Sequence, residues 1–339
     1  MLLYSAYKKY DNHHRKGRWD FLHFFLGSNL YFKLKNYLEV RPVAHLYLKG
    51  KNATDLKTIV LMFDGQVYNA GLADRLRSMA SVFSWCKKHG LELKIFFNQP
   101  FALSDYLVPN LYDWIVSKDF LDYSIACPKA LISYSKIFGE DNNRLFHREA
   151  LDYFLKCGKE QIHLYTNTYC YDECFYECFN ELFKPSAQLE TELNGFGCDI
   201  GTEYISVSFR FTQLLGDLKD TFGQPLPEKE REVLIKKCID SIMPILDDNK
   251  VEKCLVTSDS KTFLEEVSKL PYVYLLPGEV GHISNDVSEE QIRKTFWDMF
   301  MISRAKKAYM VRTKQMYRSG FAMRAAMIGD IPFEELIID

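Results

Sequence analysis

The stretch TIVLMFDGQVYNAGLADRLRSMASVFSWCKKHGLELKIFF, residues 58–97, decides the fold. Its first six residues form a run of β-forming apolar side chains, which is typical of a strand buried on both faces. A polar loop follows, and apolar positions at helical spacing then predict a helix over 73–89, with Gly90 as its C-cap. Residues 93–97 read as the next strand. Strand, helix and strand in this order predict a right-handed βαβ unit with parallel strands.

The same alternation returns in the last third of the chain. We expect strands over 203–211, 253–258, 272–276 and 307–311, and helices over 228–246, 261–270, 289–303 and 319–328. Residues 100–200 show no clear alternation, apart from a helix predicted over 171–183. The pattern therefore predicts an α/β protein with two doubly wound, Rossmann-like domains that face each other across a central cleft.

The predicted domain limits follow from composition. Pro, Ser, Asn and Gly cluster near residues 186–198, and we place the seam there. This gives an N-terminal extension over 1–54, a first domain over 55–195 and a second domain over 196–339. Ligands of such folds bind at the carboxyl ends of the strands, so the residues just past each strand are the candidates for chemistry.

Length and composition limit the class of protein. The chain has 339 residues, of which 47% are hydrophobic and 26% charged, as in ordinary globular proteins and unlike disordered or collagen-like chains. Its longest stretch free of Asp, Glu, Lys and Arg, residues 21–32, is shorter than the roughly 20 residues that span a bilayer. The first residues lack the apolar core and the cleavage site of a secretory signal. We therefore expect a cytoplasmic protein.

The charge is unevenly spread along the chain. The net charge is -2, yet residues 1–51 contain ten Lys or Arg and only three Asp or Glu, interleaved with aromatic side chains. Two interpretations stay open: residues 8–35 rest on an anionic membrane surface, or the extension packs on the body with a solvated basic face. Nucleic-acid binding is not expected, because the remainder is acidic and no recognition motif accompanies the basic end.

The nine cysteines are an odd number scattered through a large chain, which indicates reduced thiols. Cys170, Cys174 and Cys178 recur at helical spacing, whereas zinc and iron–sulfur motifs commonly pair cysteines two residues apart. We interpret them as a buried helical stripe and expect no metal.

The first candidate site lies where the first loop meets the first helix. Gly71, Asp74, Arg75 and Arg77 stand there, and the amides of a helix N-terminus favour an anion. The chain contains neither G-x-G-x-x-G nor G-x-x-x-x-G-K-[ST], so its sequence does not support a dinucleotide or P-loop site. An ordinary glycine turn followed by two charged helical residues is the competing interpretation.

Three further residues follow the strands of the second domain. Arg210 stands at the exit of an apolar strand, where its guanidinium could fork onto two phosphate oxygens or form a structural ion pair. Asp217, in the loop beyond, is a candidate general base or an exposed loop residue. Asp259 follows the next strand and is a ligand contact or the N-cap of the helix after it.

The last candidate site is the basic loop after residues 307–311. Positive side chains and the open amides of a helix start make a phosphate cradle. Its members are Arg312, Lys314, Arg318, Ser319, Gly320 and Phe321. Each site is weak alone, but at successive strand ends they indicate a pyrophosphate-containing ligand such as a nucleotide-sugar.

At these residues the sequence resembles the fucosyltransferase superfamily, which includes the α1,2-, α1,6- and protein O-fucosyltransferases. GLADRLRSMA (71–80) is similar to the Gly-rich first loop and helix of that family, and ISVSFRFTQLLGD (205–217) to its V-x-V-H-x-R-R-x-D strand. CLVTSDSKTFLEE (254–266) resembles the strand that ends in a T-D-D type turn, and residues 302–327 resemble the closing segment. Ser208 and Phe211 depart from the family pattern, which has His and a second Arg there.

The resemblance implies a GT-B fold, GDP-fucose as donor, inversion at the anomeric carbon and no metal cofactor, and the absence of a D-x-D triplet is consistent with the last point. It places Arg210 at the phosphate-binding arginine, Asp259 at the acidic residue after the next strand, and 319–321 at the phosphate-facing helix start. The implied enzyme is of the bacterial, cytoplasmic type. We expect residues 55–195 to form the acceptor domain and 196–339 the donor domain. We predict Arg210 and Asp217 as the catalytic residues, Asp217 from its place in the loop after the strand alone.

The predicted function is transfer of fucose to a hydroxyl of a surface polysaccharide or a lipid-linked oligosaccharide. Two alternatives remain. The chain is a GT-B glycosyltransferase for another nucleotide-sugar, or a catalytically inactive partner subunit that keeps the fold.

Overall fold

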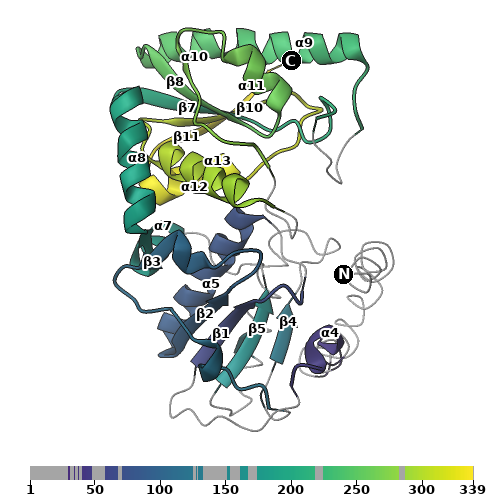
Figure 1. Cartoon of the computed structure of the whole chain (residues 1–339), viewed down its shortest axis with the longest axis vertical. Helices are drawn as coiled ribbons and strands as arrows, with labels where there is room; N and C mark the ends of the chain where they lie inside the picture. Colours follow the sequence, from purple (N-terminus) through teal and green to yellow (C-terminus); the bar gives the residue numbers. More distant parts are fainter. Residues whose placement is uncertain are drawn as a thin grey trace. The chain divides into compact units, whose positions relative to one another are not determined.

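The computed structural model describes residues 30, 34, 37, 40–47, 58–67, 71–124, 127, 129–132, 151–152, 161–166, 174–217, 224–281 and 287–338. The chain divides into two compact units (Figure 1). The first unit comprises residues 1–104 and 109–183, and the second comprises 105–108 and 184–339. The predicted seam at residue 195 falls inside helix α8 (Ala187–Ile200), which belongs to the second unit.

The first unit is built on a parallel sheet with the strand order β2-β1-β5-β4. The bounds of these strands are Thr58–Phe63 for β1, Glu92–Phe97 for β2, Lys129–Ile132 for β4 and Gln161–Thr166 for β5. Helix α5 (Leu72–His89) connects β1 with β2, which pair in register from Thr58 opposite Glu92. The predicted βαβ unit is therefore confirmed.

Helix α5 ends as its sequence predicts. Gly90 has φ 63°, the left-handed conformation that glycine adopts without a Cβ penalty, and its amide donates to the carbonyls of Cys86 and Lys87. Lys87, Lys88 and His89 lie in the last turn, where positive charge favours the helix dipole.

Shorter elements complete the first unit and its border. They are α4 (Arg41–Ala44), η2 (Leu103–Asp105), β3 (Leu107–Pro109), η3 (Lys118–Phe120), α7 (Phe175–Leu182) and β6 (Phe183–Pro185), with β3 and β6 paired. The helix predicted over 171–183 is α7, and its expected first residues lie outside the described part of the chain. Strands β4 and β5 were not predicted, because they lie in the aromatic-rich segment that has no regular alternation.

The second unit contains a parallel sheet with the strand order β11-β10-β7-β8-β9. Its strands are β7 (Tyr204–Phe209), β8 (Lys253–Ser258), β9 (Val273–Tyr274), β10 (Ala308–Arg312) and β11 (Phe333–Ile337). Within this sheet β7 comes first in the sequence, and β8 and β9 follow it on one side. The next strand, β10, lies on the other side of β7, with β11 beyond it. This reversal between β7 and β10 is a topological switch point, where ligands of open α/β sheets bind.

Helices cover both faces of this sheet, as Figure 1 shows. On one side lie α9 (Glu228–Asp240), α10 (Ile242–Asn249) and α11 (Lys261–Val267), and on the other α12 (Glu289–Ser303) and α13 (Phe321–Gly329). Alternate residues of β7 serve the two layers: Val207 belongs to the apolar cluster that contains Phe263 of α11, whereas the hydroxyl of Tyr204 donates to the Met301 carbonyl of α12 at 2.7 Å. The doubly wound architecture expected from the sequence is confirmed.

Two elements differ from the sequence prediction. The single helix expected over 228–246 is two helices, which meet at Ser241. Pro244 explains the break, because proline lacks an amide hydrogen and its ring clashes with the carbonyl four residues earlier, that of Asp240. Strand β11 was not predicted, since FEELI is a partly exposed, acidic edge strand without a buried apolar run.

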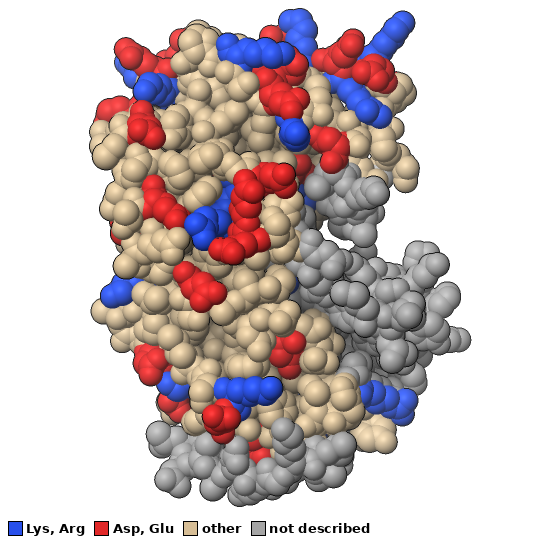
Figure 2. All heavy atoms as spheres, in the orientation of Figure 1, with Lys and Arg blue, Asp and Glu red and all other residues tan. Residues whose placement is uncertain are grey.

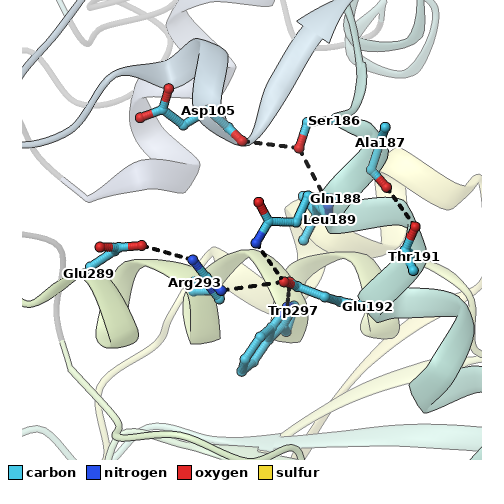
Figure 3. A network of polar contacts seen from close by, with 10 residues as sticks. All are labelled: Asp105, Ser186, Ala187, Gln188, Leu189, Thr191, Glu192, Glu289, Arg293 and Trp297. Atoms are coloured by element: carbon cyan, nitrogen blue, oxygen red, sulfur yellow. Dashed lines mark hydrogen bonds and ion pairs between the residues drawn. The ribbon is translucent and has the colours of Figure 1, made fainter.

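Helix α8 belongs to the second unit through contacts with α12 (Figure 3). The carboxylate of Glu192 accepts from the Trp297 indole at 2.7 Å and from the guanidinium of Arg293 at 3.4 Å. Ser186 caps the helix by accepting from the Leu189 amide, and its hydroxyl donates to the Asp105 carbonyl at 3.0 Å. These bonds explain why Asp105 is grouped with the second unit although it is distant in sequence.

Gly329 marks a close approach of α13 to α12 and yields a stability prediction. A Cβ at this position would lie 1.9 Å from the backbone carbonyl oxygen of Ser303, so the two helices would have to separate. We expect Gly329→Ala to lower the free energy of unfolding by about 3 kcal/mol. Urea unfolding of the full chain would measure this change.

Gly195 is the matched control for that variant. It lies within α8, where a Cβ would meet nothing within 4 Å. Gly195→Ala is therefore expected to raise the free energy of unfolding by about 0.5–1 kcal/mol, through helix propensity alone. Equal stability of the two variants would contradict the close-packing account of Gly329.

Candidate functional site

The carboxyl ends of β7 and β8 bring together two residues singled out from the sequence. The strands pair in register up to Phe209 opposite Ser258, so the next residue of each strand emerges at the same place. These residues are Arg210 and Asp259, and Arg210 Nη1 lies 3.1 Å from Asp259 Oδ2. The Asp259 side chain is 3% exposed and that of Arg210 is 17% exposed, so the guanidinium reaches the surface while its partner is buried.

The Asp259 carboxylate also binds the backbone that follows Arg210. Its Oδ1 accepts from the Phe211 amide and its Oδ2 from the Thr212 amide, both at 2.8 Å. Burial raises the pKa of Asp259 above its ordinary value, and Arg210 and the two amides oppose this rise. Thr212 has φ 54°, a strained conformation for a β-branched residue that its bond to Asp259 holds in place. Asp259 thus fixes both the cation and the turn beside it.

Two neighbouring contacts complete this edge of the sheet. Ser208, which stands where the resemblance has His, shares a hydrogen bond of 2.7 Å with the Thr257 hydroxyl on β8. Asp217 Oδ2 accepts from the Ser260 hydroxyl at 2.7 Å and from the Thr262 amide at 2.8 Å, at the start of α11. Ser260, not Asp259, is the N-cap of this helix, and Asp217 supports the cap. The role of Asp217 as a base stays a prediction, with one carboxylate oxygen occupied by helix donors.

The basic loop after β10 is held by an acidic residue that sequence reasoning missed. Glu335 on β11 accepts from Arg312 Nε at 2.6 Å through one oxygen and from Arg318 Nε at 2.7 Å through the other. Burial alone would raise the pKa of Glu335, but the hydrogen bonds and charges of Arg318 and Arg312 outweigh it and lower this pKa. Arg312 and Arg318, the two arginines of this loop that the sequence predicts to bind phosphate, are therefore anchored to the edge strand β11. The only sequence signal for their partner is the acidic pair of FEELI.

The start of α13 is arranged as an open helix N-terminus. Gly320 precedes the helix, and a Cβ there would meet nothing within 4 Å. The Ser319 hydroxyl accepts from the Phe321 amide at 3.2 Å, and Lys314 is exposed in the loop before it. These residues follow β10, next to β7 in the sheet, so they and Arg210 flank the topological switch point of the second unit.

The first predicted site lies in the opening turn of α5, and its charges bind one another or the fold. Arg75 is 2% exposed, and its Nη1 donates to the Gln99 carbonyl at 3.2 Å while its guanidinium lies over the Phe97 ring. Arg77 pairs with Asp74 at 2.9 Å. Gly71 is the N-cap residue and accepts from the Asp74 and Arg75 amides. The structure thus gives these residues packing and capping contacts, and anion binding there stays a prediction.

The predicted cysteine stripe is described in part. Cys178 is buried within α7, Cys174 stands directly before this helix, and Cys170 lies outside the described residues. The cysteines in the described part of the chain are free thiols. Over that same part, no three His, Cys, Asp or Glu side chains are grouped to hold a metal ion.

The predicted membrane-contacting segment, residues 8–35, lies outside the described residues except for Leu30 and Leu34, whose side chains are exposed. Among the helices that the structure describes, none has the length and apolarity needed to cross a bilayer. On the face drawn in Figure 2, acidic and basic side chains are interspersed over the second unit.

Comparisons with known proteins identify the fold. No protein-family model matches the chain, and no curated protein matches its sequence. Solved structures do match. The NodZ α-1,6-fucosyltransferase, in a crystal soaked with GDP-fucose, superposes with a TM-score of 0.52 at 14% identity, covering 83% of this chain and 95% of its own. NodZ structures include one from Bradyrhizobium, with a TM-score of 0.53 at 15% identity.

Two eukaryotic structures match to a similar degree. FUT1 of Arabidopsis thaliana in complex with GDP has a TM-score of 0.53 at 14% identity, and covers 95% of this chain and 78% of its own. POFUT1 in complex with GDP has a TM-score of 0.52 at 11% identity, and covers 84% of this chain and 99% of its own. The chain has the mixed α/β fold with parallel sheets of these GT-B fucosyltransferases. At such low identity the likeness shows the fold, and the chemistry must be argued from the residues.

Proposed function

We propose that the chain is an inverting glycosyltransferase that moves fucose from GDP-fucose to a hydroxyl group. The observation that carries this proposal is the Arg210–Asp259 pair at the carboxyl ends of two central strands, beside the switch point of the second unit. A buried carboxylate that orients a partly exposed guanidinium creates a preorganised anion site. The structural neighbours support the choice of anion, because their crystals contain GDP or GDP-fucose.

In this reaction the acceptor oxygen forms a bond to the anomeric carbon of fucose as the bond from that carbon to the diphosphate breaks. The electron pair of the broken bond leaves with GDP, so negative charge grows on the departing phosphate. Arg210 would neutralise this charge, and its position would not have to change during the step, because Asp259 holds it before the donor binds. The backbone amides in the first turn of α13, beyond the Phe321 amide that donates to Ser319, would bind the other phosphate.

We further propose that the acceptor is a surface polysaccharide or a lipid-linked oligosaccharide, modified in the cytoplasm without a metal ion. The basic, aromatic sequence of residues 8–35 supports this, since such segments bind anionic membrane surfaces. A membrane-bound acceptor would then be met by a transferase that rests on the same surface.

A thermal-shift titration with GDP, UDP and CDP tests the donor proposal. Ligands that bind only the native state stabilise it, by about 2.7 kcal/mol at a concentration one hundred times Kd. We expect GDP to raise Tm in a concentration-dependent way, and UDP and CDP to have little effect. Stabilisation by UDP without GDP would point to a different nucleotide-sugar, and no stabilisation by any of the three would overturn the transferase proposal.

A further inference from the structure

A network of polar side chains, most of them buried, lies along β5 in the first unit. Gln161, His163 and Tyr165 alternate along this strand, so their side chains share one face, and all three are at most 3% exposed. Tyr47, fully buried, joins them from the segment after α4: its hydroxyl lies 2.6 Å from His163 Nδ1 and 3.1 Å from the Tyr165 hydroxyl. His163 Nε2 lies 2.6 Å from Gln161 Oε1. The last member of this hydrogen-bond network is Asp64, whose Oδ2 is 3.4 Å from the Tyr165 hydroxyl.

Backbone groups fix the direction of these hydrogen bonds. The Asp122 amide donates to Gln161 Oε1 at 2.6 Å, and Gln161 Nε2 donates to the Phe120 carbonyl, so the orientation of the Gln161 amide is determined. Its oxygen can only accept, and His163 Nε2 must therefore carry the donated hydrogen. Burial lowers the pKa of His163 to about 4, which keeps the ring neutral at pH 7 and leaves Nδ1 as an acceptor. The Tyr47 proton is consequently committed to His163.

The Tyr165 hydroxyl, in contrast, has two possible acceptors for its hydrogen bond. It can point to the Tyr47 oxygen or to Asp64 Oδ2. When Asp64 is ionised, Tyr165 donates to the carboxylate. When Asp64 is protonated, its own O–H can donate to the Tyr165 oxygen while the Tyr165 proton turns to Tyr47. The network therefore satisfies both protonation states of Asp64 by rotation of one hydroxyl, which is the property required of a group that receives and releases a proton.

Asp64 also lies where a ligand of the first unit is expected. It directly follows β1, and β1 and β5 are neighbours from which the sheet builds outward in opposite directions, to β2 and to β4. This is the topological switch point of the first sheet. The side chain is half-buried, its Oδ1 accepts from the Gln66 amide at 3.1 Å, and burial raises its pKa, which moves a carboxylate toward the range useful for a general base.

We propose that Asp64 is the general base of the transfer reaction and that Tyr165 is its positioning residue. This inference rests on the proposed glycosyl transfer, and it gives Asp64 the role that the sequence analysis assigned to Asp217. In the step, the acceptor hydroxyl forms its bond to the anomeric carbon, its proton passes to the Asp64 carboxylate, and the electron pair of the broken bond leaves with the nucleoside diphosphate. Tyr165 then turns its proton toward Tyr47, and the network returns when Asp64 releases the proton to solvent.

The kinetic test compares two isosteric pairs of variants. Asp64→Asn is expected to lower kcat for transfer about 10²–10⁴-fold, with nucleotide affinity unchanged. Asp113→Asn is its control, because that side chain is 74% exposed in the same unit and should leave kcat as it is. Asp217→Asn separates the two candidate bases. A wild-type kcat in Asp64→Asn would overturn the proposal, and a loss of kcat seen in Asp217→Asn alone would do the same.

A pH profile tests the positioning role of Tyr165. Its hydroxyl stabilises the ionised form of Asp64, so Tyr165→Phe should raise the pKa of Asp64 and move the acid limb of kcat to higher pH. Tyr176→Phe should leave the acid limb in place, because the Tyr176 side chain is exposed on α7. Other titratable groups also face this region: Tyr123 faces Asp64, and Cys127, Asp122 and Lys129 face the hydrogen-bond network. Burial raises the pKa values of Tyr123 and Cys127 to about 12, so both side chains stay neutral over the pH range of the acid limb. An unmoved acid limb in Tyr165→Phe would overturn the positioning role.

A measurement without substrate separates this inference from the proposed function. In the full chain labelled with ¹³C at Asp carboxyls, the Asp64 signal is assigned by its loss in Asp64→Asn. We expect its pKa to lie above the ordinary aspartate value and to rise further in Tyr165→Phe. An ordinary pKa, unchanged in the variant, would overturn the network even if GDP binds. Absence of GDP binding together with the expected titration would instead overturn the proposed donor and leave the network supported.

Discussion

Replacing Arg210 by alanine is expected to lower kcat/KM for fucosyl transfer about 10²–10³-fold, the loss found when one preorganised group that stabilises developing charge is removed. The physical reason lies in the arrangement around it. The guanidinium is held by Asp259 before any ligand arrives, and the carboxylate is held in turn by two backbone amides. No reorganisation is then needed when charge grows on the diphosphate. Transfer assays with GDP-fucose and isothermal titration with GDP measure the two effects.

Two companion variants make this prediction specific. Arg210→Lys keeps a cation for Asp259 but loses the planar fork that matches phosphate, so it should fold normally and still lose much of the affinity for GDP. Arg304→Ala removes an arginine that pairs with Glu190 on the surface of α8, and it should leave GDP affinity unchanged. If Arg210→Lys and Arg210→Ala both bound GDP as the wild type does, the pair with Asp259 would be purely structural.

The sequence located the main edge of this site because strand ends are readable. Apolar runs define β7 and β8, and the polar residues that follow them are the ones exposed at the carboxyl edge. Arg210 and Asp259 were each singled out on that ground. Their pairing was not, because it depends on the register between two strands separated by two helices. Parallel pairing places both strand ends side by side, and only the structure shows that register.

The residues that sequence reasoning missed share a different cause. Glu335 lies on a short acidic edge strand, which has no apolar signal, although it anchors both Arg312 and Arg318. Tyr47 and His163 lie far apart in the sequence, and the strand that carries His163 sits in the irregular aromatic segment. A buried histidine in such a segment is indistinguishable from an ordinary core residue until its neighbours are known. Polar networks between distant segments are therefore the part of a site least accessible from one sequence.

Asp259→Asn is expected to lower the free energy of unfolding by about 3–5 kcal/mol, the usual cost of removing one partner of a buried ion pair. The amide has the same shape, but it can present only one oxygen to three donors. Its NH₂ group must face the Phe211 amide, the Thr212 amide or the Arg210 guanidinium, and a buried donor then remains without an acceptor. Asp240→Asn is the control, since Asp240 and its partner Lys236 are exposed on α9 and such pairs contribute about 0.5 kcal/mol.

The relative stabilities of Arg210→Met and Asp259→Asn discriminate between a simple ion pair and an aspartate that also binds two backbone amides. Were Asp259 present only to neutralise Arg210, the loss of either residue would destabilise the protein by a similar amount. Because Asp259 also accepts from two amides, one of them belonging to the strained Thr212, it keeps two of its three partners when Arg210 is replaced. Arg210→Met should therefore retain clearly more stability in urea unfolding than Asp259→Asn. Equal destabilisation would show that the amide bonds contribute little, and the guanidinium would then owe its position to charge pairing alone.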